Sequence, residues 1–182
     1  MSENRFDVSG KRILITGASS GFGAHFARVL AEQGADLVLA ARRVEKLEET
    51  AGAVRALGRD AVVVPMNVAD HASVEAAFER MPALDVVVNN AGISRDGATD
   101  TLSEEDWSAV VDTNLNGVWA VSKFAIQQWR RDGRPGNIIN IASILGLRVG
   151  AMLAPYTVAK AAVVQFTQSI ALDYARHNIR CN

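Results

Sequence analysis

Thr16-Gly17-Ala18-Ser19-Ser20-Gly21-Phe22-Gly23 follows the apolar run 11–16 and precedes a helix-like stretch. Gly17 permits a tight turn off a strand, Gly21 removes a side chain where a pyrophosphate would approach, and Gly23 allows close packing of helix on sheet. The first N–H groups of a helix attract phosphate, and the hydroxyls of Ser19 and Ser20 add hydrogen bonds. The stretch, including Phe22, therefore predicts a dinucleotide-binding turn. A glycine-rich loop without a ligand is the alternative interpretation.

The rest of the chain alternates apolar strand-like runs with helix-like segments. Strands are predicted at 11–16, 36–41, 61–66, 84–89 and 137–142, with a sixth beginning at 179. Helices are predicted at 21–33, 44–57, 70–80, 103–131 and 156–177, the fourth in one or two pieces. Strands that are apolar throughout and alternate with helices indicate a parallel sheet covered on both faces. We therefore expect an α/β fold with a doubly wound parallel sheet in three layers, as one domain over residues 1–182.

The composition limits the classes of function. The chain has 182 residues, of which 49% are hydrophobic, and a net charge of −1. This balance gives no reason to expect nucleic acid or an anionic membrane as a partner. Cys181 is the only cysteine, and the three histidines show no metal-ligand spacing, so neither disulfides nor a metal site is expected. The segment 1–6 lacks an apolar signal core, which predicts a cytoplasmic setting.

The end of the second predicted strand bears on the choice of cofactor. A carboxylate at this place would accept hydrogen bonds from the adenosine ribose and favour NAD. The chain instead has Ala41 followed by Arg42. A guanidinium can pair with a 2′-phosphate, so we expect NADP(H) to be preferred, with NAD(H) also possible. Alternatively, the arginine belongs to the solvated start of the next helix.

A tyrosine, a lysine and a serine form the candidate catalytic set. Tyr156 and Lys160 are four residues apart, so they share one face of a helix. The ordinary pKa of tyrosine is about 10, and the lysine charge can lower it. Ser143 is expected to close the fifth strand at the carboxyl edge of the sheet, where it can hold a carbonyl oxygen. Together these residues predict hydride chemistry on a small-molecule carbonyl or alcohol, with Tyr156 as acid or base.

With the glycine turn, these residues resemble the short-chain dehydrogenase/reductase family over essentially the whole chain, and most resemble its 3-oxoacyl-[acyl-carrier-protein] reductase-like members. The resemblance implies a Rossmann fold. Asn89-Asn90-Ala91-Gly92 resembles the family's second signature, which supports the cofactor pocket. Asn114 matches its active-site asparagine, which the resemblance implies holds a water for a proton relay through Lys160. Asn67, before Val68, stands where many members have an aspartate that contacts adenine. The resemblance also gives Tyr156 and Lys160 contacts to the cofactor.

The resemblance carries two further expectations. Family members usually continue with a substrate-covering segment and a last strand, so we expect both to be absent from this sequence. The helical regions 103–131 and 156–177 match the family's association surface, which implies a homodimer or homotetramer. Substrates left open are a 3-oxoacyl thioester and a small sugar or steroid alcohol. The rival function is a non-catalytic dinucleotide-binding sensor or scaffold.

Overall fold

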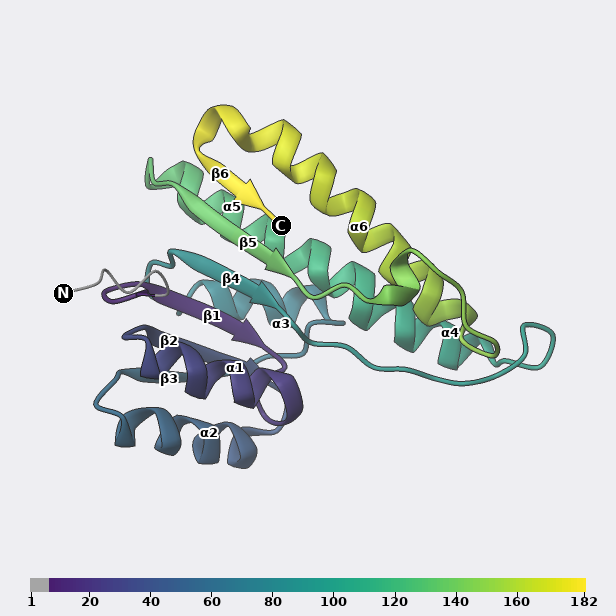
Figure 1. The fold of residues 1–182 in the computed structure, drawn as a ribbon, viewed down its shortest axis with the longest axis horizontal. Helices are drawn as coiled ribbons and strands as arrows, with labels where there is room; N and C mark the ends of the chain where they lie inside the picture. Colours follow the sequence, from purple (N-terminus) through teal and green to yellow (C-terminus); the bar gives the residue numbers. More distant parts are fainter. Residues whose placement is uncertain (1–6) are drawn as a thin grey trace.

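The computed structural model describes residues 7–182 and shows six parallel strands in one sheet (Figure 1). Residues 1–6, for which the sequence predicts no signal peptide core, lie outside the described residues. The spatial order is β3-β2-β1-β4-β5-β6, which reverses direction between β1 and β4. Such a reversal opens a crevice at the carboxyl ends of the strands. The strand bounds are β1 Arg12–Thr16, β2 Asp36–Ala41, β3 Ala61–Pro65, β4 Val86–Asn89, β5 Gly136–Asn140 and β6 Ile179–Cys181.

Over residues 7–182, six α-helices connect or follow these strands, and local sequence signals set several of their ends. The side chain of Asp70 accepts hydrogen bonds from the amides of Ala72 and Ser73, which caps α3 as predicted. Ser103 caps α4 by accepting from the amide of Asp106. The bounds are α1 Gly21–Glu32, α2 Val44–Ala56, α3 His71–Phe78, α4 Glu104–Val111, α5 Gly117–Arg131 and α6 Ala154–Tyr174.

Two local features could not be settled from the sequence. The helical region 103–131, predicted in one or two pieces, is continuous, because the π-helical turn Asp112–Asn116 joins α4 to α5. The prediction that Ser143 closes the fifth strand is wrong, since β5 ends at Asn140. Ser143 instead caps the 3-10 helix Ile144–Gly146, where its hydroxyl accepts a hydrogen bond from the amide of Leu145 at 3.1 Å. A serine favours such caps over the interior of a strand.

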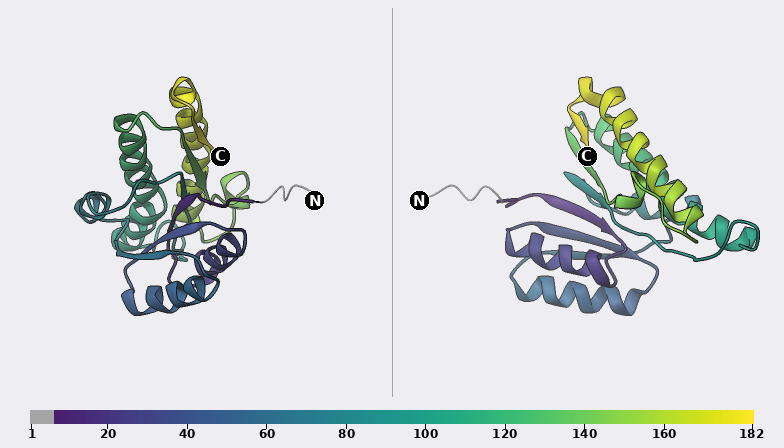
Figure 2. Two further views of the ribbon diagram at one scale, coloured as in Figure 1. Left: turned by 90° about the vertical axis from the view of Figure 1, so that its left-hand side faces the viewer. Right: turned by 45° about the vertical axis from the view of Figure 1, so that its right-hand side comes forward.

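The helices form two layers, one on each face of the sheet (Figure 2). Helices α1 and α2 pack small and branched side chains on one face. Helices α3, α5 and α6 cover the other face, around the buried ring of Trp129. This ring lies so close to β5 that a side chain at Gly136 would collide with it. Within residues 7–182, no helix has the length and apolar character needed to cross a bilayer.

Candidate active site

A cavity of about 380 Å³ lies at the carboxyl ends of the strands. Many residues predicted to bind the cofactor line it, although they come from four separate stretches of the chain. These residues are Gly17, Ser19, Ser20, Gly21, Phe22, Arg42, Asn67, Val68, Asn90, Ala91 and Gly92. Gly23, Tyr156 and Lys160 are not among its lining residues. The fold therefore brings the predicted dinucleotide residues together around one hollow.

The glycine turn is shaped by close backbone approaches. Gly17 has φ +68°, and a Cβ there would stand 2.9 Å from the Cα of Ala91. A Cβ at Gly23 would collide with the carbonyl of Gly17. At Gly21 the same position is open, as expected where a phosphate must approach the backbone. The predicted role of each glycine therefore fits the space around it.

The hydroxyl of Thr16 ties the end of β1 to the end of β4. It accepts hydrogen bonds from the backbone amides of Asn90 and Ala91, both at 3.0 Å. The Asn90 side chain donates in return to the Thr16 carbonyl at 2.9 Å. Asn90 therefore supports the wall of the cavity by holding the turn in place. Thr16 was not singled out from the sequence, although it stands directly before the first glycine of the motif.

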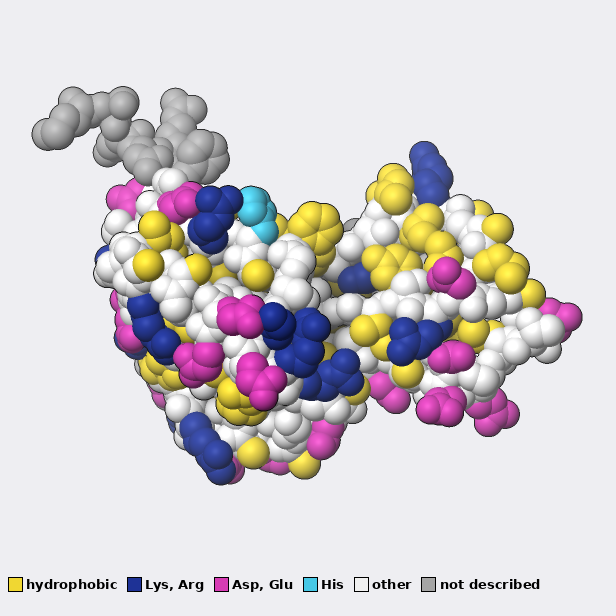
Figure 3. Space-filling view, turned by 90° about the horizontal axis from the view of Figure 1, so that it is seen from below, with side chains coloured by type: hydrophobic (Ala, Val, Ile, Leu, Met, Phe, Trp, Pro, Cys, Tyr) yellow, Lys and Arg dark blue, Asp and Glu magenta, His cyan; other side chains and the backbone are white. Residues whose placement is uncertain are grey.

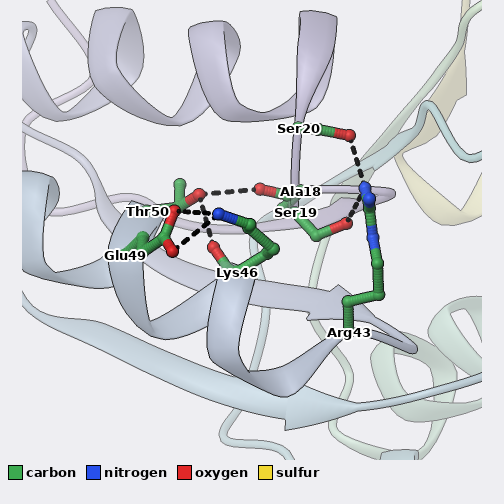
Figure 4. Close-up of polar contacts among 7 residues, drawn as sticks. All are labelled: Ala18, Ser19, Ser20, Arg43, Lys46, Glu49 and Thr50. Carbon is green, nitrogen blue, oxygen red and sulfur yellow. Dashed lines mark hydrogen bonds and ion pairs between the residues drawn. The ribbon is translucent and has the colours of Figure 1, made fainter.

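Arg43 is a second site residue that sequence reasoning missed. One guanidinium nitrogen, Nη2, donates to the hydroxyls of Ser19 at 3.0 Å and Ser20 at 2.6 Å (Figure 4). Arg42 and Arg43 both line the cavity. The arginine expected at the end of β2 thus has a second arginine beside it in the cavity wall, and this second arginine is hydrogen-bonded to the glycine turn; phosphate binding by the pair stays a prediction.

Two features of α1 and α2 keep the turn suited to an anion. The Ser20 hydroxyl makes no capping bond to α1, and no acidic residue lies in the first turn of that helix. The N-terminus of α1 therefore keeps its partial positive charge toward the cavity. From α2, the hydroxyl of Thr50 lies 3.0 Å from the Ala18 carbonyl oxygen and supports the turn from behind (Figure 4).

The opposite wall of the cavity holds Asn67 and Val68. The side-chain carbonyl of Asn67 accepts from the amide of Ala69 at 3.3 Å, which stabilises the local turn. A side chain at Gly117 would stand 2.9 Å from Val68, so this glycine lets α5 approach the wall closely. This side of the cavity is therefore closely packed against α5, and the adenine contact of Asn67 stays a prediction.

The segment that carries Ser143 packs against α6. A Cβ at Gly146 would lie 2.9 Å from the backbone carbonyl oxygen of Lys160, so the glycine permits the close contact. Ser143 and Tyr156 are both half-buried. The displaced serine therefore remains beside the helix that carries the tyrosine and lysine.

Lys160 is buried, with only 4% of its surface exposed. Its ammonium nitrogen donates to the carbonyl of Ile141 at 2.6 Å and lies 5.7 Å from the centroid of the Tyr156 ring. Burial lowers the pKa of Lys160 from its ordinary value, because the charged form loses solvation. The lysine thus places a partly desolvated cation over the face of the predicted catalytic tyrosine.

Asn114 lies fully buried within the π-helical turn. Its side chain accepts from the amide of Ile93 and donates to the carbonyl of the same residue, both at 2.8 Å. The turn that carries Asn114 packs against α6. The observed contacts of this side chain therefore fix the chain after β4, and the predicted water-holding role stays a prediction.

Other chemistry-bearing side chains are less suited to a site. Burial raises the pKa of the Cys181 thiol to about 11, so the thiol is protonated at neutral pH. No group of three or more His, Cys, Asp or Glu residues within 7–182 could hold a metal ion.

Exposed apolar side chains surround the segment that carries Ser143 and the start of α6. Figure 3 shows a hollow with Lys and Arg side chains on one side and hydrophobic side chains gathered on the other. The exposed hydrophobic residues of these segments are Ile144, Leu147, Val149, Met152 and Val158. The surface beside the candidate catalytic residues is therefore mainly apolar.

Comparisons with known proteins agree with this geometry. The family model "short chain dehydrogenase" matches residues 11–182. The chain is 37% identical to 2,3-dihydro-2,3-dihydroxybenzoate dehydrogenase of Bacillus subtilis, covering 98% of this chain and 70% of that protein. It is also 37% identical to gluconate 5-dehydrogenase of Gluconobacter oxydans, covering 97% and 70%.

Solved structures give the same result. A gluconate 5-dehydrogenase from Burkholderia cenocepacia, in complex with NADP and tartrate, superposes with a TM-score of 0.92 at 38% identity. That match covers 98% of this chain and 71% of the other. The fold, the glycine turn and these similarities together show that the chain belongs to the short-chain dehydrogenase family and is an oxidoreductase acting on alcohol or carbonyl groups.

Proposed function

We propose that this enzyme prefers NADP(H) and interconverts a ketone or aldehyde with its alcohol, using Tyr156 as the acid–base residue. The observation that carries the proposal is the meeting of three elements: the 3-10 helix after Ser143 and the π-helical turn of Asn114 both pack on α6. Helix α6 holds Tyr156 and Lys160, and the predicted dinucleotide-binding residues line a cavity at the carboxyl ends of the strands. When bound, the cofactor supplies or accepts the hydride.

Each catalytic side chain has a distinct proposed role. During reduction, the hydroxyl of Tyr156 gives its proton to the substrate's carbonyl oxygen, and in the reverse direction it takes the proton back. The hydroxyl of Ser143 donates a hydrogen bond to the same oxygen and orients it. The cation of Lys160, 5.7 Å from the tyrosine ring centroid, places positive charge beside the residue that transfers the proton. Asn114 contributes to a proton path toward Lys160.

The apolar surface bears on the substrate class. Val149 is 86% exposed and Leu147 is 66% exposed, both in the segment between Ser143 and Tyr156. Apolar walls favour a substrate with an apolar part. This observation supports a 3-oxoacyl thioester or a steroid-like alcohol over a sugar, although two of the relatives named above act on gluconate.

Replacing Tyr156 with Phe tests the assignment. NADPH oxidation is measured with acetoacetyl-coenzyme A, 5-keto-D-gluconate and cyclohexanone. We expect kcat to fall by at least about a hundredfold, because the proton donor is lost, while the dissociation constant for NADPH stays within about twofold. Tyr174→Phe, which alters the only other tyrosine, should leave kcat unchanged. If Tyr156→Phe retains full turnover, the acid–base assignment is wrong; if the parent protein binds NADPH but reduces none of the three compounds, the sensor hypothesis gains support.

The arginine pair predicts the preference for NADPH over NADH. Arg42→Ala and Arg43→Ala should each raise the dissociation constant for NADPH by about 10- to 100-fold, as expected for a lost charge-assisted hydrogen bond. Binding of NADH should change much less, because it has no 2′-phosphate. Fluorescence titration of both cofactors measures the two constants. Arg28→Ala, at an exposed ion pair on α1, serves as the matched control. Equal losses for the two cofactors would contradict a phosphate-binding role.

The buried lysine predicts a pH dependence of stability. Because the folded pKa lies below the unfolded value of 10.5, the unfolded chain binds more protons between these two values. The contribution of this group to stability therefore rises as the pH increases through that window. Relative to Lys160→Met, the parent protein should gain free energy of unfolding between pH 7 and pH 10, as measured by urea unfolding. A constant difference between the two proteins would show that burial does not shift this pKa.

A second copy of the chain is the proposed partner for the groove between α5 and α6. Trp119 is 45% exposed beside this groove. Lys123 and Arg130 on α5 lie across the groove from Asp173 on α6, a charge pattern that can pair with itself around a two-fold axis. Trp119→Glu should shift sedimentation from dimer or tetramer toward monomer, whereas Val29→Glu on α1 should not. A parent protein that sediments as a monomer would contradict the proposal.

A further inference from the structure

Met152 has a backbone conformation that its side chain does not favour. Its φ is +62°, in the left-handed region where residues other than glycine are uncommon. The side chain is 54% exposed, so burial of this side chain does not explain the conformation. Such strain persists only where the surrounding structure enforces it, and it is often found near functional sites.

The contact that holds Met152 comes from the segment after β4. The amide of Gly97 donates to the carbonyl of Met152 at 2.9 Å. Gly97 also pairs in parallel with Leu153 as an isolated β-bridge, outside the main sheet. Two loops far apart in the sequence are therefore joined by backbone bonds directly before α6.

The same segment is fixed at its other end. The side chain of Asn114 makes two hydrogen bonds to the backbone of Ile93, at 2.8 Å each. Residues 93–97 thus span from the π-helical turn to the loop that precedes α6. We refer to residues 93–97 as the strut.

The strut acts on the start of α6. Leu153 occupies the N-cap position of this helix, and no side chain makes a capping hydrogen bond there. The carbonyl of Leu153 accepts from the amide of Thr157 at 2.9 Å and so begins the first turn. Tyr156 lies inside this turn. The orientation of Leu153 therefore sets the direction in which the Tyr156 side chain leaves the helix.

We propose that Gly97 and Met152 are positioning residues, whose backbone contact holds Tyr156 in its reactive orientation through Leu153. Neither residue needs to touch the substrate in this role. The inference rests on the proposed function of Tyr156. The inference also implies that Asn114 helps to position Tyr156 through the strut. This role would be additional to the predicted role of Asn114 in holding a water.

Two variants of Met152 separate a role of its backbone from a role of its side chain, because the two roles predict opposite rankings of the variants by kcat. Met152→Gly removes the side chain but adopts φ +62° without strain. Met152→Val keeps an apolar side chain, but its branched Cβ opposes this conformation. If the backbone matters, kcat should fall by about 10- to 100-fold in the valine variant and stay well above that level in the glycine variant, with KM little changed. If the side chain contacts substrate, the glycine variant should lose at least as much and KM should rise.

Gly97 gives an independent pair of variants. Gly97→Pro removes the N–H that binds Met152. Gly97→Ala keeps this N–H, and the nearest atom to its Cβ would be the flexible Cδ1 end of the Leu102 side chain at 2.8 Å, with the Cβ and Cα of Leu102 at ordinary contact distances of 3.4 and 3.6 Å. We expect the proline variant to lose about tenfold more kcat than the alanine variant, on the scale that misplaced reactive groups produce. Thermal unfolding checks that both variants fold.

Hydrogen exchange tests the positioning without any substrate. The Thr157 amide should exchange at least about tenfold faster in Met152→Val and Gly97→Pro than in the parent, because the first turn of α6 opens more often. Kinetics use whichever of acetoacetyl-coenzyme A, 5-keto-D-gluconate or cyclohexanone the parent reduces fastest. Unchanged exchange at Thr157 in both variants would overturn the inference, even if the parent reduces none of them. Faster exchange with unchanged kcat would overturn the link to Tyr156, and a larger kcat loss in Met152→Gly than in Met152→Val would overturn the backbone role.

Discussion

The hydrogen bonds from two successive amides to the hydroxyl of Thr16 join the two halves of this molecule. They hold the ends of β1 and β4 together at the point where the strand order reverses. The glycine turn leaves one of these strands and the Asn90 segment leaves the other, so this junction fixes the relative position of two of the stretches that line the cofactor cavity. The two segments approach closely here, since a Cβ at Gly17 would stand 2.9 Å from the Cα of Ala91.

The catalytic side of the crevice depends on a buried charge, whose loss of hydration must be offset by contacts within the protein. The ammonium of Lys160 is compensated by one short bond to a backbone carbonyl and by the face of an aromatic ring. This partial compensation is costly for the fold, but it keeps the cation close to the phenol instead of dispersed in solvent. Stability and reactivity therefore make opposite demands on this residue.

The sequence predicted the features that follow from local chemistry. The alternation of apolar runs with helices indicated the parallel sheet, and the glycine spacing placed the turn that lines the cavity. Asp70 and Ser103 marked helix starts because their side chains bond to nearby amides. Most of the predicted dinucleotide-binding residues line one cavity, because the stretches that contain them follow the carboxyl ends of parallel strands. The cytoplasmic setting stays a prediction.

Features that arise from contacts between distant segments could not be predicted in this way. Nothing in the local sequence shows that Arg43 would reach the glycine turn, or that Gly97 would bond to Met152. The serine was placed wrongly because an apolar run does not reveal where pairing with its neighbours stops. In the π-helical turn, the residue types are ordinary, and the geometry results from packing against α6 and from the bonds of Asn114 to Ile93.

The π-helical turn also constrains how this chain can change in length. Such a turn is equivalent to an α-helix that has received one additional residue. Loss of one residue from Asp112–Asn116 would restore regular winding with both flanks close to their present positions, because the wide turn absorbs the additional residue. Asn114 would then lose the local geometry that directs its side chain to the backbone of Ile93, while Trp129 would keep its place. A deletion here would therefore cost the link between this helix and the segment after β4 rather than the packing of the helix.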